Sequence, residues 1–159
     1  MKRVPPPSPG VAEPSSARPR QLVLYVEDDE DNRQVAAFRL SKRYELVCAA
    51  TDREACELLE QRGREVAIIL MDIELKGGRL NGVDLARLVR GRLDRADLPA
   101  YAQRVPVLDT PILFVTAYGD KYRRPELLSA GGDEVIAKPV DFVALHTAMT
   151  RVYLQRIAT

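Results

Sequence analysis

The sequence has few of the residues that usually bind zinc or form disulfides. It contains two cysteines and one histidine, and the spacing of Cys48 and Cys56 matches no metal-binding motif. Both thiols are expected to be buried and reduced, as is usual for a cytosolic protein. His146, the only histidine, falls in a helical pattern near the end of the sequence. It is expected to have a structural role.

The sequence also lacks an excess of charge of either sign and a long apolar run. Its 24 basic and 23 acidic side chains leave a formal charge of +1, so no overall field attracts nucleic acid or an acidic membrane. No apolar run approaches the roughly 20 residues that a membrane helix needs, and the polar, proline-rich start does not resemble a signal peptide. A cytoplasmic protein that contacts neither nucleic acid nor membrane is therefore expected.

The chain is long enough for one domain with a real core. Its 159 residues include 46% hydrophobic and 30% charged residues, as in an ordinary globular protein. Residues 1–20 differ, because they combine many prolines with serines and a few arginines and have almost nothing to bury. This tail is expected to be disordered, as a solvated leader or alternatively as a docking peptide. The ordered domain is expected to cover residues 21–157.

Short apolar runs alternate with helical patterns along the ordered part. The run at 65–71 is continuously apolar up to its end, which is typical of a strand covered on both faces in a parallel sheet. Predicted strands cover 21–26, 44–49, 65–71, 110–115 and 134–137, and predicted helices cover 32–43, 52–61, a stretch from about 82, 126–130 and 142–156. Every connection is long enough for a right-handed crossover. The pattern predicts an α/β fold with one parallel sheet and helices on both faces.

Helix-capping residues support these boundaries. Asp29 or Asp31 is expected to cap the first helix, and Thr51 the second, where Glu54 is placed to complete a capping box. Gly63 is expected to end the second helix. Asp141 is expected to cap the last one.

Polar side chains follow four of the predicted strands: Glu27 and Asp28 after the first, then Asp72, Thr116 and Lys138. Parallel strands share their carboxyl-terminal edge, where open α/β sheets bind ligands, so these side chains are expected to lie together. An aspartate after a strand can instead begin a turn or cap a helix. That explanation is adequate for Asp72 taken alone, but it does not account for all five polar residues at the strand ends.

The chemistry of this set indicates a cation and an anion. Unit charges about 4 Å apart repel by roughly 4 kcal/mol at an effective dielectric constant of 20, so three gathered carboxylates need a divalent cation. Ligands that are all oxygen favour Mg²⁺. A carboxylate beside Mg²⁺ and a lysine is well placed to accept a phosphoryl group, because both cations neutralise the transferring oxygens.

Four short motifs at these strand ends carry a family resemblance. Val26-Glu-Asp-Asp, Met71-Asp-Ile, Phe114-Val-Thr-Ala and Ala137-Lys-Pro resemble the signatures of the receiver domain of two-component response regulators, the CheY-like domains. The resemblance covers about residues 21–157. It implies a doubly wound, flavodoxin-like sheet of five strands in the order 2-1-3-4-5. It also implies a histidine kinase or histidine phosphotransfer protein as phosphoryl donor, and a separate output protein.

The resemblance also implies a role for each site residue. Asp72 matches the phosphoacceptor and, with Asp28, a direct Mg²⁺ ligand, while Glu27 matches their outer acidic companion. The backbone carbonyl of Glu74 is implied as a further metal ligand. In the same way, the resemblance implies that Thr116 is the switch hydroxyl, that Lys138 binds the phosphoryl group and that Pro139 follows a cis peptide bond.

The sequence departs from the family pattern in three places. The usual proline and glycine four and eight residues after the phosphoacceptor are Lys76 and Leu80, and Gly82 comes two places late, which implies a two-residue insertion. Val135 replaces the usual switch aromatic, so rotation of a buried Tyr or Phe ring cannot carry the signal at this position. Tyr118, two residues after Thr116, is expected to shield the phosphoryl group from water.

The third departure is the long segment 91–109, which exceeds the usual two to six residues between a helix and a strand. Arginines and apolar residues interleave there, namely Arg90, Arg92, Arg95 and Arg104 with Leu93, Leu98, Tyr101 and Val105. One hypothesis is an ordered surface patch that binds a partner. The alternative is a tolerated insertion.

The expected function is that of a stand-alone receiver, a phosphorylation-controlled interaction module rather than an enzyme. One alternative is a degenerate receiver whose partner ignores phosphorylation. A second alternative is a haloacid-dehalogenase-like phosphatase, with Glu74 as a general acid two residues after the nucleophile. The cap and the later acidic motif of such phosphatases are missing from the sequence.

Overall fold

The computed structural model of the protein describes residues 18–117 and 121–158. Most of the proline-rich stretch, residues 1–17, therefore lies outside the described residues, as does Tyr118. Residues 18–20 are exposed and have no regular secondary structure. The first strand begins directly after them.

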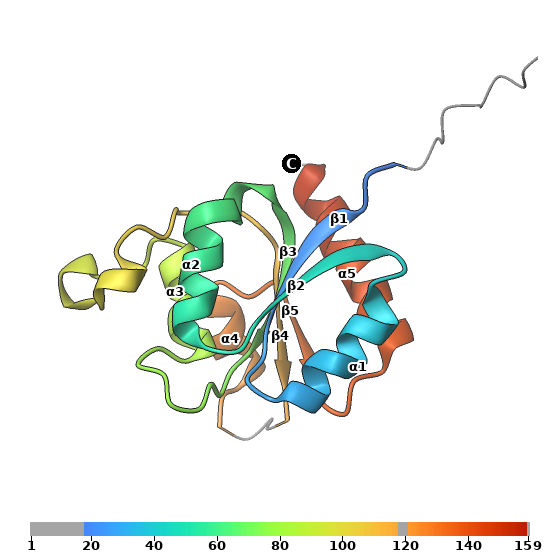
Figure 1. The fold of residues 1–159 in the computed structure, drawn as a ribbon, viewed down its shortest axis with the longest axis horizontal. Helices are drawn as coiled ribbons and strands as arrows, with labels where there is room; N and C mark the ends of the chain where they lie inside the picture. Colours follow the sequence, from blue (N-terminus) through green and yellow to red (C-terminus); the bar gives the residue numbers. More distant parts are fainter. Residues whose placement is uncertain (1–17, 118–120, 159) are drawn as a thin grey trace, which may run out of the picture.

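The core of the fold is a five-stranded parallel sheet in the order β2-β1-β3-β4-β5, which confirms the predicted fold class and strand order (Figure 1). The strands are β1 (Gln21–Val26), β2 (Tyr44–Ala49), β3 (Val66–Asp72), β4 (Ile112–Thr116) and β5 (Glu134–Ala137). Each predicted strand is present, and the largest difference is that β4 begins two residues later than expected.

Helices cover both faces of the sheet (Figure 1). They are α1 (Glu30–Leu40), α2 (Asp52–Arg62), α3 (Gly82–Val89), α4 (Arg124–Ser129) and α5 (Phe142–Ile157). In Figure 1 the sheet is seen nearly edge-on, with α1 and α5 on its right and α2, α3 and α4 on its left. The chain therefore forms three layers.

Alternating side chains of the central strands divide the core in two. Leu24 and Val26 of β1 pack into the cluster under α2, α3 and α4, whereas Val23 and Tyr25 pack into the cluster under α1 and α5. Both faces of a central parallel strand are covered. This explains why the strand sequences are continuously apolar rather than alternating.

Side-chain caps fix the helix starts, with some differences from the predicted boundaries. Asp29 caps α1, so this helix spans 30–40 rather than 32–43. Thr51 caps α2 as predicted, but the Glu54 carboxylate accepts from the N–H of Ala50 rather than from that of Thr51. The predicted capping box is therefore displaced by one residue.

Two further predictions can be compared with the structure at this level. Gly63 follows α2 with a helical φ of −54° and opens a short 3-10 helix at Gly63–Glu65, so it ends the helix without a left-handed turn. His146 has a structural place, because its ring nitrogens contact Arg43 and the hydroxyl of Tyr44 at 2.6 and 2.7 Å. These contacts join α5 to the start of β2.

The remaining details concern the cysteines and the peptide bond before Pro139. Cys56 is buried as expected, but Cys48 is only half-buried, because it lies on the edge strand β2. The bond between Lys138 and Pro139 is cis, as the resemblance implies.

Segment 91–109 is ordered and folds back onto α2. It contains two short 3-10 helices, η2 (Arg95–Asp97) and η3 (Ala100–Ala102). Its buried residues Ala102 and Val105 belong to the core cluster under α2, α3 and α4. In Figure 1 the segment forms the yellow projection at the left of the molecule.

Two of the four arginines named in the partner hypothesis, Arg90 and Arg95, bind backbone oxygens of the protein itself. Arg90 donates to the carbonyls of Gly131 and Leu108, and Arg95 donates to those of Gln103 and Val105. Both side chains are partly buried, whereas Arg92 and Arg104 of the same set are exposed. That the segment binds a partner stays a prediction, which only the two exposed arginines are placed to serve. The role of Arg90 and Arg95 is to satisfy carbonyl groups that no regular structure pairs.

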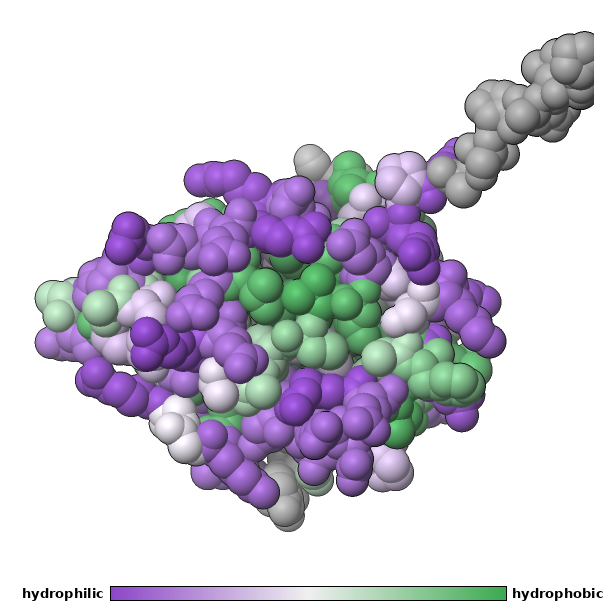
Figure 2. Space-filling view, in the orientation of Figure 1, coloured by the Kyte–Doolittle hydropathy of each residue, from purple (hydrophilic) through white to green (hydrophobic). Residues whose placement is uncertain are grey.

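The surface seen in Figure 2 is mostly hydrophilic, with an apolar strip over the edge strand β2 between α1 and α2. The half-buried residues Leu46, Val47 and Cys48 of β2 account for part of it. Among the described residues, no helix has the length and apolar character needed to cross a membrane.

Candidate functional site

The site lies at the carboxyl-terminal edge of the sheet, which is the lower edge in the figures. Asp72 ends β3 and pairs in register with Val115 of β4, while Thr116 ends β4 and pairs with Ala137 of β5. The parallel ladder continues one residue past β5, because the N–H of Lys138 donates to the carbonyl of Thr116 at 2.8 Å. The strand register therefore brings these side chains together.

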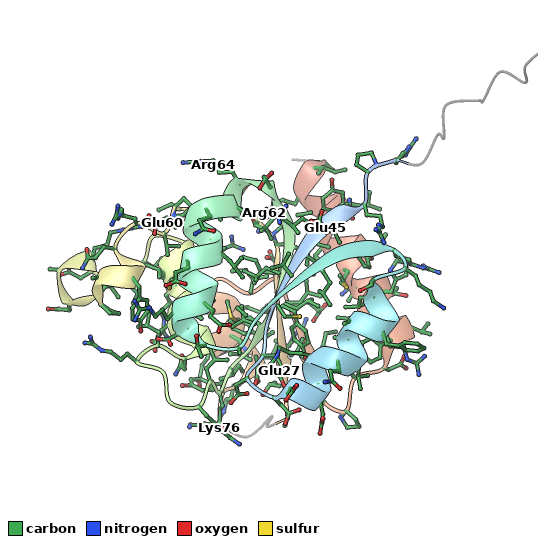
Figure 3. All side chains as sticks on the ribbon, in the orientation of Figure 1. Glu27, Glu45, Glu60, Arg62, Arg64 and Lys76 are labelled. Atoms are coloured by element: carbon green, nitrogen blue, oxygen red, sulfur yellow. The ribbon has the colours of Figure 1, made fainter. Side chains whose placement is uncertain are left out.

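The first strand contributes the acidic pair next to them. The N–H of Glu27 donates to the carbonyl of Ala49 at 2.9 Å, which extends the pairing of β1 with β2 beyond the strand. Figure 3 shows Glu27 beside the start of α1 and Lys76 at the lower edge of the molecule. Glu45, Glu60 and Arg62 lie toward the opposite edge.

Three carboxylates meet at this edge. One carboxylate oxygen from each of Glu27, Asp28 and Asp72 lies within 4.8 Å of the other two. Glu27 is completely buried and Asp72 is 7% exposed, whereas Asp28 is half-buried. Water therefore screens the charges of Glu27 and Asp72 poorly.

Lys138 offsets part of this negative charge. Its ammonium lies 3.0 and 3.1 Å from the two carboxylate oxygens of Glu27 and 3.6 Å from Oδ2 of Asp72. The side chain of Lys138 is only 16% exposed. One partly buried cation thus faces two buried carboxylates.

The environment of Asp72 favours its protonated form in the absence of a metal ion. Burial raises the pKa of Asp72, and the neighbouring carboxylate of Glu27 adds to this effect; the pKa reaches about 8 although Lys138 opposes the shift. Asp28 also raises it. The physical cause is that desolvated carboxylates crowd together with a single ammonium between them.

Asp28 is held by the loop between β3 and α3, residues 73–81. Its Oδ2 accepts a hydrogen bond from the N–H of Lys76 at 3.0 Å. The loop closes tightly behind the site, because a Cβ on Gly82 would lie 1.9 Å from the carbonyl oxygen of Asp72. Gly82 therefore allows α3 to begin directly against the backbone of Asp72.

The remaining predicted residues line the same hollow. It has a volume of about 160 Å³ and is bordered by Glu27, Asp28, Asp29, Asn32, Asp72, Glu74, Lys76, Thr116, Ala117 and Lys138. Thr116 is 7% exposed. The side chain of Glu74 is half-exposed and forms an ion pair with Lys121 at 3.1 Å. The structure thus brings all six predicted site residues to one hollow.

Two further residues at the site were not singled out in the sequence. Asn32 donates from Nδ2 to Oε1 of Glu27 at 2.6 Å, and Arg33 donates to the backbone carbonyl of Glu27 at 2.9 Å. Both lie in the first turn of α1. The only available signal was that the first turn of this helix follows directly after the acidic residues.

The donor set of this hollow fits a hard divalent cation. The ligand atoms that Glu27, Asp28 and Asp72 offer are all carboxylate oxygens. Mg²⁺ prefers such oxygen ligands and retains several water molecules, for which the open hollow has room. The arrangement can neutralise and orient an anion placed between Asp72 and Lys138.

Comparison with known proteins places this site in a family. The family model described as the response regulator receiver domain matches residues 23–150.

Curated relatives match over most of this chain. The chain is 35% identical over 134 residues to the aerobic respiration control sensor protein ArcB of Escherichia coli. The aligned region covers 84% of this chain and 15% of ArcB. The chain is 30% identical over 123 residues to the response regulator protein PilR of Pseudomonas aeruginosa, which covers 77% of the chain and 24% of PilR. The chain thus spans less than a quarter of the length of these two relatives.

Solved structures of similar fold include isolated receiver domains. The receiver domain of a sensor histidine kinase from Pseudomonas aeruginosa, solved with a magnesium ion in its active-site cleft, is 27% identical with a TM-score of 0.64, covering 84% of this chain and 98% of that one. A CheY-like receiver domain protein from Methanospirillum hungatei has 22% identity and a TM-score of 0.68, covering 87% and 98% of the two chains. At 22% identity, the match to the Methanospirillum hungatei structure supports a shared fold alone.

Proposed function

Because the chain belongs to the family of response regulator receiver domains, we propose that Asp72 accepts a phosphoryl group from a phosphohistidine. The donor is a histidine kinase or a histidine phosphotransfer protein. The observation that carries the proposal is the position of Lys138, whose ammonium lies 3.6 Å from Oδ2 of Asp72 at the edge of an acidic hollow. A purely structural aspartate needs neither this partly buried lysine nor the two neighbouring carboxylates.

The metal proposed for the site is Mg²⁺. Asp28, Asp72 and the backbone carbonyl of Glu74 are its proposed ligands, with Glu27 as the outer acidic companion. The clustering of the three carboxylates supports this assignment, as does the magnesium ion bound by the receiver domain from Pseudomonas aeruginosa. When bound, Mg²⁺ supplies positive charge next to the phosphoryl oxygens and the attacking carboxylate.

In the proposed step, a carboxylate oxygen of Asp72 forms a bond to phosphorus while the bond from phosphorus to the donor's imidazole nitrogen breaks. The electron pair of the broken bond remains on that nitrogen. Lys138 is within reach of a phosphoryl oxygen, and its ammonium balances the negative charge carried to Asp72. The hydroxyl of Thr116, in the same hollow, then donates a hydrogen bond to the aspartyl phosphate.

The output of the domain is proposed to be phosphorylation-dependent contact with a separate protein. The structure has Val135, half-buried against the core cluster under α2, α3 and α4, at the position that the family usually gives to an aromatic residue. A rotating aromatic ring at this position therefore does not take part. In this proposal the protein acts as a stand-alone receiver in the cytoplasm. It contacts neither nucleic acid nor a membrane directly.

Two alternatives remain distinct from this proposal. A degenerate receiver binds its partner without phosphorylation. A haloacid-dehalogenase-like phosphatase needs a general acid, and Glu74 occupies the required sequence position. Its side chain is 50% exposed and paired with Lys121, however, which favours a surface role over proton transfer at Asp72.

Phosphorylation by acetyl phosphate tests the proposal. With Mg²⁺, the parent protein should gain one acid-stable, base-labile phosphoryl group, and Asp72→Asn should gain none. Asp31→Asn is the matched control, because Asp31 belongs to the same acidic run but is exposed on the first turn of α1. Labelling of Asp72→Asn, or labelling without metal, contradicts the assignment, and turnover of p-nitrophenyl phosphate identifies the phosphatase alternative.

A further inference from the structure

Asp52 is an acidic residue that the proposed chemistry does not use, and it is 3% exposed. It begins α2, where an acidic side chain usually faces solvent and interacts with the helix dipole. Here its Oδ2 instead accepts hydrogen bonds from the N–H groups of Arg79 and Leu80, both at 3.1 Å, and from the hydroxyl of Tyr101. One carboxylate oxygen therefore joins three parts of the chain.

The first two bonds fix the β3–α3 loop. Gly78 lies so close to Asp52 that an added Cβ would be 2.7 Å from Oδ1. At its other end, the same loop donates from the N–H of Lys76 to Asp28 at 3.0 Å. The loop is thus attached to Asp52 on one side and to a proposed metal ligand on the other.

The third bond comes from segment 91–109. Tyr101 lies in η3, and its ring packs against the core cluster under α2, α3 and α4. The guanidinium carbon of Arg53 lies 5.7 Å from the centre of this ring. The β3–α3 loop and segment 91–109 are the two places where extra length is inferred from the sequence. In the structure they meet at Asp52.

The charge of Asp52 is stabilised at this junction. Burial acts to raise the pKa of Asp52, but the hydrogen bonds from Tyr101 and from the N–H groups outweigh it, so that the pKa is lowered. A buried carboxylate that keeps its charge strengthens each hydrogen bond that it accepts.

We propose that Asp52 and Tyr101 are positioning residues that hold the β3–α3 loop and thereby set the Mg²⁺ affinity of the site. This inference rests on the proposed function, because the loop carries the carbonyl of Glu74 and the N–H that orients Asp28. A loop that is held in place before the ion arrives loses less conformational entropy on binding. Segment 91–109 thus has a role at the site without contacting it.

The test compares Tyr101→Phe with the parent protein by calorimetric titration with Mg²⁺ and by amide hydrogen exchange. The variant keeps the ring and removes only the hydroxyl donor. Loss of one hydrogen bond to a charged group predicts that Mg²⁺ binds about fivefold more weakly and that the amides of Arg79 and Leu80 exchange about fivefold faster. Asp52→Asn is expected to act in the same direction, and the double variant is expected to show less than the sum of both effects.

Leu98→Ala is the matched control, because Leu98 anchors the same segment to the core without a bond to Asp52. It should lower the thermal unfolding midpoint at least as much as Tyr101→Phe and still bind Mg²⁺ like the parent protein. Unchanged Mg²⁺ affinity in Tyr101→Phe, or an equal loss in Leu98→Ala, overturns the positioning role. If the parent protein itself binds no Mg²⁺, the proposed function fails together with this inference.

Discussion

Lys138 donates to both carboxylate oxygens of Glu27, at 3.0 and 3.1 Å, although Glu27 is completely buried. Removing one partner of a buried ion pair leaves the other charge without compensation, and this costs more than the pair itself contributes. Asn32 also donates to Glu27, but it carries no charge. Lys138 is therefore expected to serve the stability of the acidic site as well as its chemistry.

The first prediction follows from this pair. Lys138→Met should lower the free energy of unfolding by about 3 kcal/mol, because it leaves the buried carboxylate of Glu27 without its ammonium. Lys121→Met is the matched control, since that lysine is 64% exposed in an ion pair with Glu74, and it should change stability far less than Lys138→Met does. Urea unfolding at pH 7 measures both. Equal effects of the two substitutions contradict the role of Lys138.

The second prediction concerns the metal. A ligand that binds only the folded state stabilises it, by about 1.4 kcal/mol at a concentration tenfold above its Kd. Mg²⁺ should therefore raise the thermal unfolding midpoint of the parent protein and of Asp31→Ala, but not that of Asp28→Ala. If the midpoint of Asp28→Ala rises as much, or if NaCl at the same ionic strength has the same effect, the carboxylate cluster is not a specific site.

The sheet and the composition of the site could be predicted from the sequence because both depend on local patterns. Continuous apolar runs identify strands covered on both faces, and parallel strands bring the residues that follow them to one edge. Glu27, Asp72, Thr116 and Lys138 each come directly after the apolar run of a strand, and Asp28 follows one residue later. Their approach within one hollow followed from topology alone.

The path of the two expanded segments could not be predicted, because it depends on tertiary contacts. Tyr101 and the loop at Arg79 and Leu80 meet at Asp52, whose position in the sequence suggests only an acidic residue in a first helical turn. Arg95 likewise reads as a surface charge, yet it donates to two backbone carbonyls of its own segment. Periodicity and capping rules describe neighbours in sequence, and these partners are distant or irregular.

The third prediction concerns Arg90, whose guanidinium donates to Gly131, Leu108 and Asp133. Its side chain is 10% exposed. Arg90→Met should therefore lower the free energy of unfolding by about 2 kcal/mol, since it leaves carbonyl oxygens and a carboxylate unpaired. Arg92→Met is the control, because Arg92 is exposed two residues further on, and it should cost less than about 1 kcal/mol. Urea unfolding distinguishes them, and similar losses mean that the buried contacts of Arg90 contribute little.

The last prediction is a pH dependence that originates at Asp52. The hydrogen bonds of Tyr101 and Leu80 lower the pKa of Asp52 in the folded protein despite its burial. A carboxyl group whose folded pKa is lowered contributes stability above its unfolded pKa of about 4, and this contribution is lost as the pH falls through the folded pKa. The asparagine in Asp52→Asn does not titrate. The stability difference between the parent protein and this variant should therefore be constant from pH 7 to pH 5 and shrink below about pH 4.

Urea unfolding at a series of pH values measures this difference. Asp97→Asn serves as the control, because Asp97 lies in η2 of the same segment but is exposed. Its curve should run parallel to that of the parent protein. A parallel curve for Asp52→Asn as well would mean that the charge of Asp52 does not stabilise the junction. In that case packing, rather than the charge of Asp52, holds the hydroxyl of Tyr101 and the loop in place. Asp52→Asn should then bind Mg²⁺ with the affinity of the parent protein.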